Sequence, residues 1–145
     1  YNLRRKITKM GAKLDLQSIQ CLNIFSRVTG VRTKSCFTYN KCMFFVVEQR
    51  SLSRAIGEKG ANIKRLGLML RQRVKVIPES NIDNFTRMVV QPVKFKSIGI
   101  DAEGYATIFA GQQAKASLIG RDKVRILELS DILKQHFNIK GLRVI

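Results

Sequence analysis

The sequence predicts an α+β protein made of two similar units, each with the order helix, strand, strand, helix, helix, strand. Helical and extended patterns alternate along the chain in this order. The order then repeats, with an offset of 63 residues between Gly57 and Gly120. An apolar fraction of 45% in 145 residues is enough for one core of ordinary size or two small ones.

The first unit opens with apolar residues at helical spacing, and Gly30 closes this pattern. Two extended runs follow, with Asn40 and Lys41 between them where a tight hairpin turn would sit. The glycines Gly57 and Gly60 interrupt the two helices that come next. The elements predicted for this unit are helices over residues 14–30, 52–56 and 61–73 and strands over residues 33–39, 42–48 and 74–78.

The second unit repeats the first. The segment AIGEKGANI at residues 55–63 aligns with LIGRDKVRI at residues 118–126, so that a glycine and two isoleucines coincide. A proline and polar residues interrupt the periodic pattern over residues 78–81, which places the boundary there. The elements predicted for this unit are helices over residues 82–90, 114–119 and 124–137 and strands over residues 94–100, 105–110 and 142–145.

The charge predicts a polyanionic partner. The chain carries 27 Lys and Arg against 10 Asp and Glu, a formal net charge of +17, and each neutralised phosphate favours binding by releasing counterions. Residues 1–79 hold 17 basic and 4 acidic side chains, and residues 80–145 hold 10 and 6. We therefore expect nucleic acid to contact the first half more strongly, helped by a basic arm that contains Arg4, Arg5, Lys6, Lys9 and Lys13.

Several classes of protein are not expected. No apolar run reaches the length of a membrane span, and the basic start is not followed by an apolar segment and cleavage site, so we expect a cytoplasmic protein. The three cysteines, Cys21, Cys36 and Cys42, show no CxxC spacing and are interpreted as buried apolar residues.

We also expect no enzymatic activity, cofactor, metal or small-molecule substrate. His136 is the only histidine and no carboxylate pair stands out, and GEKGANIK lacks the GK[ST] ending of a nucleotide-binding loop. Four phenylalanines could stack on bases: Phe37, Phe44, Phe45 and Phe109. Their alternation along the predicted strands instead favours a place in the core for most of them.

The Ile-Gly-x-x-Gly-x-x-Ile motif between two helices, IGEKGANI, resembles the signature of the KH domain. The order of elements resembles the type II (bacterial-type) variant, a three-stranded sheet with helices packed on one face. Glycines at these places let the backbone approach a sugar-phosphate chain closely, and the amides of the following helix point toward phosphate. The resemblance implies two tandem KH domains, residues 1–79 and 80–145, which bind single-stranded RNA.

The RNA-binding residues that this resemblance implies lie in and beside the two loops. Those of the first domain are Arg54, Ile56, Gly57, Glu58, Lys59, Gly60, Lys64 and Arg65. Those of the second are Gly120, Arg121, Asp122 and Lys123. Because Lys123 stands in place of the second glycine, we expect the altered loop to be strained or remodelled. The second domain is then either a second RNA-binding site or chiefly a scaffold.

Over nearly the whole chain after residue 13, the sequence resembles the archaeal NusA-like transcription factors, which consist of little besides two KH domains. The resemblance rests on the tandem spacing, on AIGEKGANIKRL and on the ending HFNIKGLRVI. It implies a role in termination, antitermination or pausing of transcription, beside RNA polymerase. Two alternatives stay open: a basic module that docks on an acidic protein such as a polymerase subunit, and a ribosome-associated KH protein.

Overall fold

The computed structural model describes residues 16–145. They form two compact units that divide between Glu79 and Ser80. The basic residues predicted to form an arm, from Arg4 to Lys13, lie outside the described residues.

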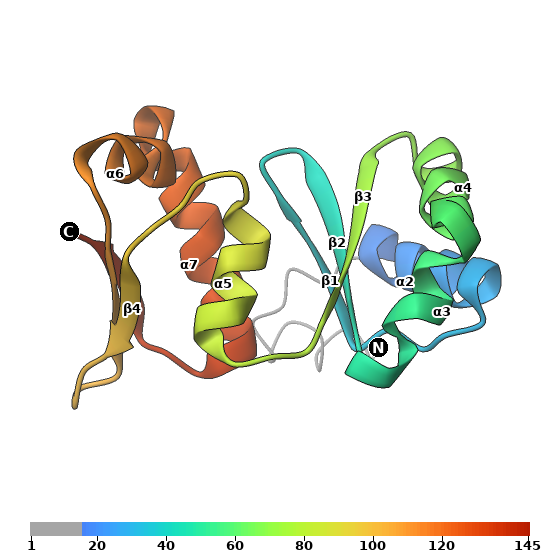
Figure 1. The fold of residues 1–145 in the computed structure, drawn as a ribbon, viewed down its shortest axis with the longest axis horizontal. Helices are drawn as coiled ribbons and strands as arrows, with labels where there is room; N and C mark the ends of the chain where they lie inside the picture. The colour runs from blue at the N-terminus through green and yellow to red at the C-terminus, as the bar shows by residue number, and fades with distance from the viewer. Residues whose placement is uncertain (1–15) are drawn as a thin grey trace. The chain divides into compact units, whose positions relative to one another are not determined.

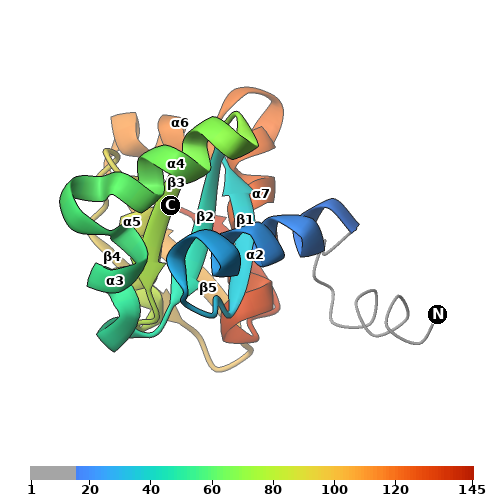
Figure 2. The same ribbon diagram turned by 90° about the vertical axis from the view of Figure 1, so that its right-hand side faces the viewer.

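The first unit is a three-stranded sheet with helices on one side of it (Figure 1). The strands run in the order β1-β2-β3, with β1 antiparallel and β3 parallel to the central β2. Figure 2 shows the three helices in front of this sheet. The elements are α2 (Leu16–Thr29), β1 (Ser35–Tyr39), β2 (Cys42–Val47), α3 (Leu52–Ile56), α4 (Ala61–Leu70) and β3 (Arg73–Pro78).

The predicted hairpin turn joins β1 to β2. Asn40 and Lys41 both have positive φ angles, 50° and 63°, which a two-residue turn needs if it is to match the twist of the strands. Asn adopts this conformation more readily than most residues, because its side chain can hydrogen-bond to the nearby backbone. The hairpin prediction is confirmed.

The core of the first unit lies between the sheet and its helices. Phe25 of α2 stacks on Phe45 of β2 with ring centroids 4.4 Å apart, and Leu66 of α4 is fully buried in the same cluster. The other face of β2 is buried as well, since Phe44 is 1% exposed and stacks on Phe37 of β1. The core assignment of these three strand phenylalanines is therefore confirmed.

The second unit has the same topology, with strand order β4-β5-β6 and the same antiparallel and parallel pairings. Its first helix begins where the sequence predicts, because the Asn81 side chain accepts a hydrogen bond from the backbone N–H of Asn84 at 2.8 Å and so caps the helix. The elements are α5 (Ile82–Val90), β4 (Ser97–Ile100), β5 (Tyr105–Phe109), α6 (Gln112–Ile119), α7 (Val124–Phe137) and β6 (Gly141–Val144).

Two predicted elements are three residues shorter at one end in the structure. Helix α4 ends three residues before the predicted Arg73, because Arg71 adopts a left-handed φ of 56°. Strand β4 starts at Ser97 instead of Lys94 because Arg87 of α5 holds the preceding segment. The Arg87 guanidinium donates to the carbonyls of Phe95 and Lys96 at 2.9 and 3.0 Å and lies over the Phe95 ring, 4.2 Å from its centroid.

The three cysteines are buried, as predicted. Burial raises the pKa of the Cys42 thiol. His136 lies inside α7, where its Nδ1 is 2.7 Å from the Ile132 carbonyl oxygen. Burial lowers the pKa of this imidazole. Within residues 16–145, no helix is long and apolar enough to cross a membrane.

Candidate nucleic-acid interface

The first loop leaves α3 at Gly57, whose φ of 80° and ψ of 165° favour glycine. A Cβ atom at this position would lie 2.9 Å from Cγ of Asn62 and 3.0 Å from its backbone nitrogen. Asn62 is in turn held in place, since its Nδ2 donates to the Arg54 carbonyl at the end of α3. The first glycine of the motif is therefore needed for both its conformation and its lack of a side chain.

The loop then turns through two more left-handed residues, Lys59 at φ 55° and Gly60 at φ 73°. The N–H of Gly60 donates to the Gly57 carbonyl at 3.1 Å and so closes the turn. The backbone amides of Glu58 and Lys59 take no part in this hydrogen bond. Both of these side chains are exposed. The loop thus presents a turn of backbone and a lysine to solvent at the start of α4.

The second loop keeps this backbone conformation without the second glycine. Gly120 has φ 76° and ψ 173°, and Asp122 has φ 54° and ψ 27°, the same ψ as Lys59. Lys123 occupies the position of Gly60 with φ 62° and ψ 20°. A Cβ at Gly60 would meet nothing within 4 Å, so a side chain fits here. Of the two predicted outcomes, backbone strain is the one found, at Lys123. The backbone of the second loop is not remodelled.

This strain leads to a stability prediction. A left-handed conformation costs a residue with a side chain about 1–2 kcal/mol, part of which is offset because glycine loses more entropy on folding. We expect Lys123→Gly to raise the free energy of unfolding by about 0.5–1 kcal/mol, as measured by urea denaturation. Lys123→Ala is the matched control, because it removes the charge and keeps the Cβ. An equal gain in both variants would mean that charge, not backbone strain, is relieved.

The isoleucines beside the loop anchor it. Ile56 and Ile63 are partly buried and pack against the core cluster of the first unit. In the second unit Ile119 and Ile126 are also partly buried, and the neighbouring Leu118 is fully buried. Each loop is therefore held at both of its ends by apolar contacts.

The cations around the two loops differ. Lys64 and Arg65 are exposed on α4, whereas the corresponding positions of α7 hold Leu127 and Glu128, the latter paired with Arg125. The guanidinium of Arg54 donates to the Gly30 carbonyl at 3.0 Å, so this predicted RNA-binding side chain also ties α3 to the end of α2. Positive charge is consequently denser beside the first loop.

The sequence reasoning missed features on the elements next to the loops. Strand β3 is an edge strand that contacts both α3 and α4. Its cations Arg73 and Lys75 alternate with the core residues Val74 and Val76 and so lie on the face away from these helices, where Lys75 is 5.7 Å from the centroid of the Phe44 ring. Two apolar side chains of α4, Leu68 and Met69, are 81% and 52% exposed. Helical periodicity could have placed Leu68 on the solvent face, because a residue two positions after the buried Leu66 faces away from it, but the same rule puts Met69 near the face of Leu66.

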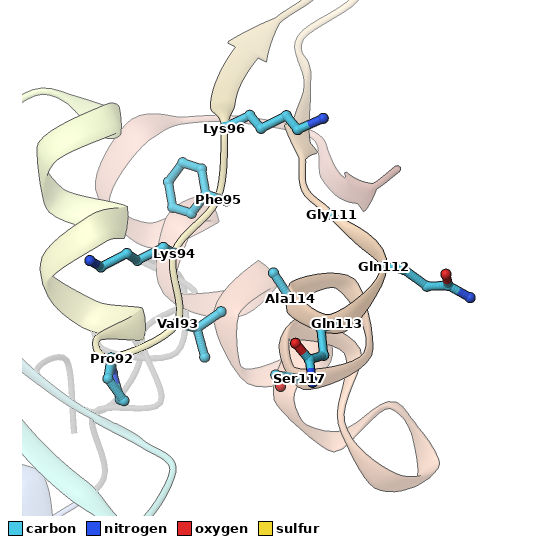
Figure 3. Close-up of a pocket in the computed structure, with 10 residues that line it drawn as sticks. All are labelled: Pro92, Val93, Lys94, Phe95, Lys96, Gly111, Gln112, Gln113, Ala114 and Ser117. Atoms are coloured by element: carbon cyan, nitrogen blue, oxygen red, sulfur yellow. The ribbon is translucent and has the colours of Figure 1, made fainter.

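A hollow of about 770 Å³ lies in the second unit, between the segment that precedes β4 and the start of α6. Figure 3 shows Phe95, Ala114 and Ser117 around it, with the Lys94 side chain directed away from it. None of its lining residues is an acid or a histidine. Among residues 16–145 no three His, Cys, Asp or Glu side chains are grouped so as to hold a metal ion.

A comparison of this sequence with known protein families agrees with the loop geometry and the sheet topology. Residues 24–94 match the KH domain family. This part of the chain has a KH-type fold. The match includes the first loop and its two helices, and it extends into the second unit as far as Lys94. KH domains are RNA-binding modules in which such a loop clamps the backbone of about four nucleotides.

Two known proteins are similar to this one over most of its length, and not only over residues 24–94. The probable transcription termination protein NusA of Methanococcus vannielii is 22% identical over 142 residues, which cover 94% of this chain and 81% of that protein. The crystal structure of APE1850 is similar with a TM-score of 0.66 at 22% identity, and the similarity covers 91% of this chain and all of that one. At this identity the second likeness shows a shared fold.

Proposed function

We propose that the protein binds single-stranded RNA through two tandem type II KH domains, residues 1–79 and 80–145. The observation that carries the proposal is the shared backbone of the two loops, from Gly57 to Gly60 and from Gly120 to Lys123. Each loop joins two helices that contact the parallel edge strand of a three-stranded sheet. The proposal assigns the protein no catalytic step.

In this proposal, phosphates meet the loops and bases lie beside them. The exposed lysines at the loops, Lys59 and Lys123, attract the RNA backbone without regard to sequence, and Lys64 and Arg65 of α4 add to this attraction in the first domain. The bases then lie along the helix–strand side of each domain, where their edges are read by hydrogen bonds. Affinity is expected to fall as salt rises, because the phosphate contacts release counterions.

The two loops are expected to contribute unequally. Replacing Lys59 and Lys64 by alanine should weaken RNA binding on the order of tenfold, and replacing Arg121 and Lys123 should weaken it less. The reason is that Leu127 and Glu128 stand in the second domain where the first has two cations. Fluorescence anisotropy with an unstructured RNA at fixed salt would measure both variants. If the second pair cost more affinity, the ranking of the domains would be wrong.

We further propose that the protein acts in transcription termination, antitermination or pausing and associates with RNA polymerase. The likeness to a probable termination protein over 94% of the chain supports this role. The competing role is direct docking of the basic surface on an acidic protein. Nuclease treatment separates the two when purified polymerase and RNA are mixed with the protein: an RNA-bridged complex is lost, and a directly docked one survives.

A further inference from the structure

The second sheet has one face without helices. Figure 1 shows α5, α6 and α7 of the second unit on a single side of the sheet. On the central strand β5, Ala106 and Ile108 are fully buried toward those helices. Because side chains alternate along a strand, Tyr105, Thr107 and Phe109 form a row on the opposite face.

Phe109 is the exposed member of this row, since Tyr105 and Thr107 are partly buried. Phe109 is 43% exposed, and Ile145 at the chain end is 57% exposed. A Cβ atom added at Gly99 would meet nothing within 4 Å. Three of the residues paired across from the row are small, since Ser97, Gly99 and Gly141 lie opposite Phe109, Thr107 and Tyr105. On the side of β4, no large side chain therefore stands beside Phe109.

A cation lies beside the middle residue of the row. Arg143 of β6 pairs with Thr107, and its guanidinium lies 5.2 Å from the centroid of the Tyr105 ring. Its Nη2 is 3.7 Å from Oδ2 of Asp101, and its side chain is 57% exposed. Arg143 partly covers Tyr105, which leaves Phe109 as the more accessible ring.

The residues at the corresponding positions of the first sheet are less exposed. The pairing registers of the two sheets put Cys42, Phe44 and Val46 of β2 at the places that Tyr105, Thr107 and Phe109 have in β5. These three residues are 6%, 1% and 3% exposed. Both sheets place a cation at the position of Arg143, since Lys75 lies 5.7 Å from the centroid of the Phe44 ring, but only the second sheet leaves an aromatic ring as exposed as Phe109, at 43%.

We propose that the helix-free face of the second sheet stacks an unpaired RNA base on Phe109, with Arg143 placed to meet the adjoining phosphate. This site is separate from the two loops, and the inference rests on the proposed RNA binding. Aromatic rings stack on any base, and arginine suits both a base plane and a phosphate. A second copy of the chain is disfavoured as the occupant, because two copies with a formal charge of +17 each repel.

A tryptophan reporter tests the inference directly, since the chain contains no tryptophan. In the F109W variant of the full chain, binding of an unstructured RNA of about 12 nucleotides, longer than two loops hold, should quench the indole fluorescence. An abasic oligonucleotide of the same length should not. The matched control is I100W: Ile100 is 50% exposed on the same sheet but pairs with Ala106 of the buried face, so its emission should change little.

Affinity supplies the second measurement. F109A should bind the same RNA roughly tenfold more weakly, because one base loses its stacking partner. If RNA binds and the loop variants weaken it, yet F109W emission and F109A affinity are unchanged, this inference is wrong and the proposed function stands. If the wild-type chain binds no RNA, both are overturned. A loss of affinity in F109A with F109W quenched equally by the abasic chain would also reject base stacking.

Discussion

Replacing Glu58 and Lys59 together by aspartate is expected to lower RNA affinity by roughly tenfold or more, since a charge-assisted contact is lost and repulsion from phosphate replaces it. The fold should survive. In the second loop Asp122 occupies the position of Lys59 with φ 54° against 55°, so an aspartate is compatible with this backbone. Fluorescence anisotropy gives the affinity, and circular dichroism and urea denaturation check the fold.

A matched control variant separates loop contact from net charge. Lys41→Asp makes the same change of charge at an exposed residue with a left-handed φ of 63°, but it lies in the hairpin turn between β1 and β2. It should weaken binding only slightly. If the loop variant folds well and keeps its RNA affinity, the first loop is not part of the RNA site. If both variants lose affinity equally, the loss comes from the change in net charge and not from a contact at the loop.

RNA affinity is expected to rise steeply with length until roughly eight to ten nucleotides are available, because each loop holds about four nucleotides. Beyond that length the only further rise expected is the step from a base stacked on Phe109, which F109A should remove. The two units are joined closely: β3 ends at Pro78 and α5 begins at Ile82. Once one loop holds the strand, binding at the other becomes intramolecular. Anisotropy with RNA oligomers of graded length at constant salt would measure this, since salt otherwise alters affinity independently of length.

The loop variant provides the comparison for this series. In the full chain with Glu58 and Lys59 both replaced by aspartate, only the second loop remains, so the rise should end at about four or five nucleotides. A wild-type plateau already at that length would show that one domain alone engages RNA. The second domain would then act as a scaffold.

The order of elements could be predicted from sequence because local signals specify it. Periodicity gave the helices and strands, and Asn40 with Lys41 marked a turn that their positive φ angles confirm. The ends of elements were harder to predict, because tertiary contacts set them. The start of β4 depends on hydrogen bonds from Arg87 to carbonyls eight and nine residues away, and no local pattern indicates such a contact.

The candidate site was predicted less completely. The glycines and isoleucines of the motif are local and were found. By contrast, the hydrogen bond from Arg54 to Gly30 spans 24 residues, and the exposure of Phe109 depends on what covers one face of a sheet. Alternation along β5 places Phe109 opposite Ile108, but alternation alone does not say which face of a sheet is open. Long-range burial is the information that a single sequence lacks.

The two glycines of the loop motif have unequal roles, which matters for recognising such domains in other genomes. A side chain at Gly57 or Gly120 would collide with the following helix, at Asn62 or Arg125, whereas the fourth loop position faces empty space and accepts Lys123. A search pattern that insists on glycine at the fourth position would overlook modules like the second one here. A pattern that fixes the first glycine and the flanking isoleucines, and leaves the fourth position free, would recover them.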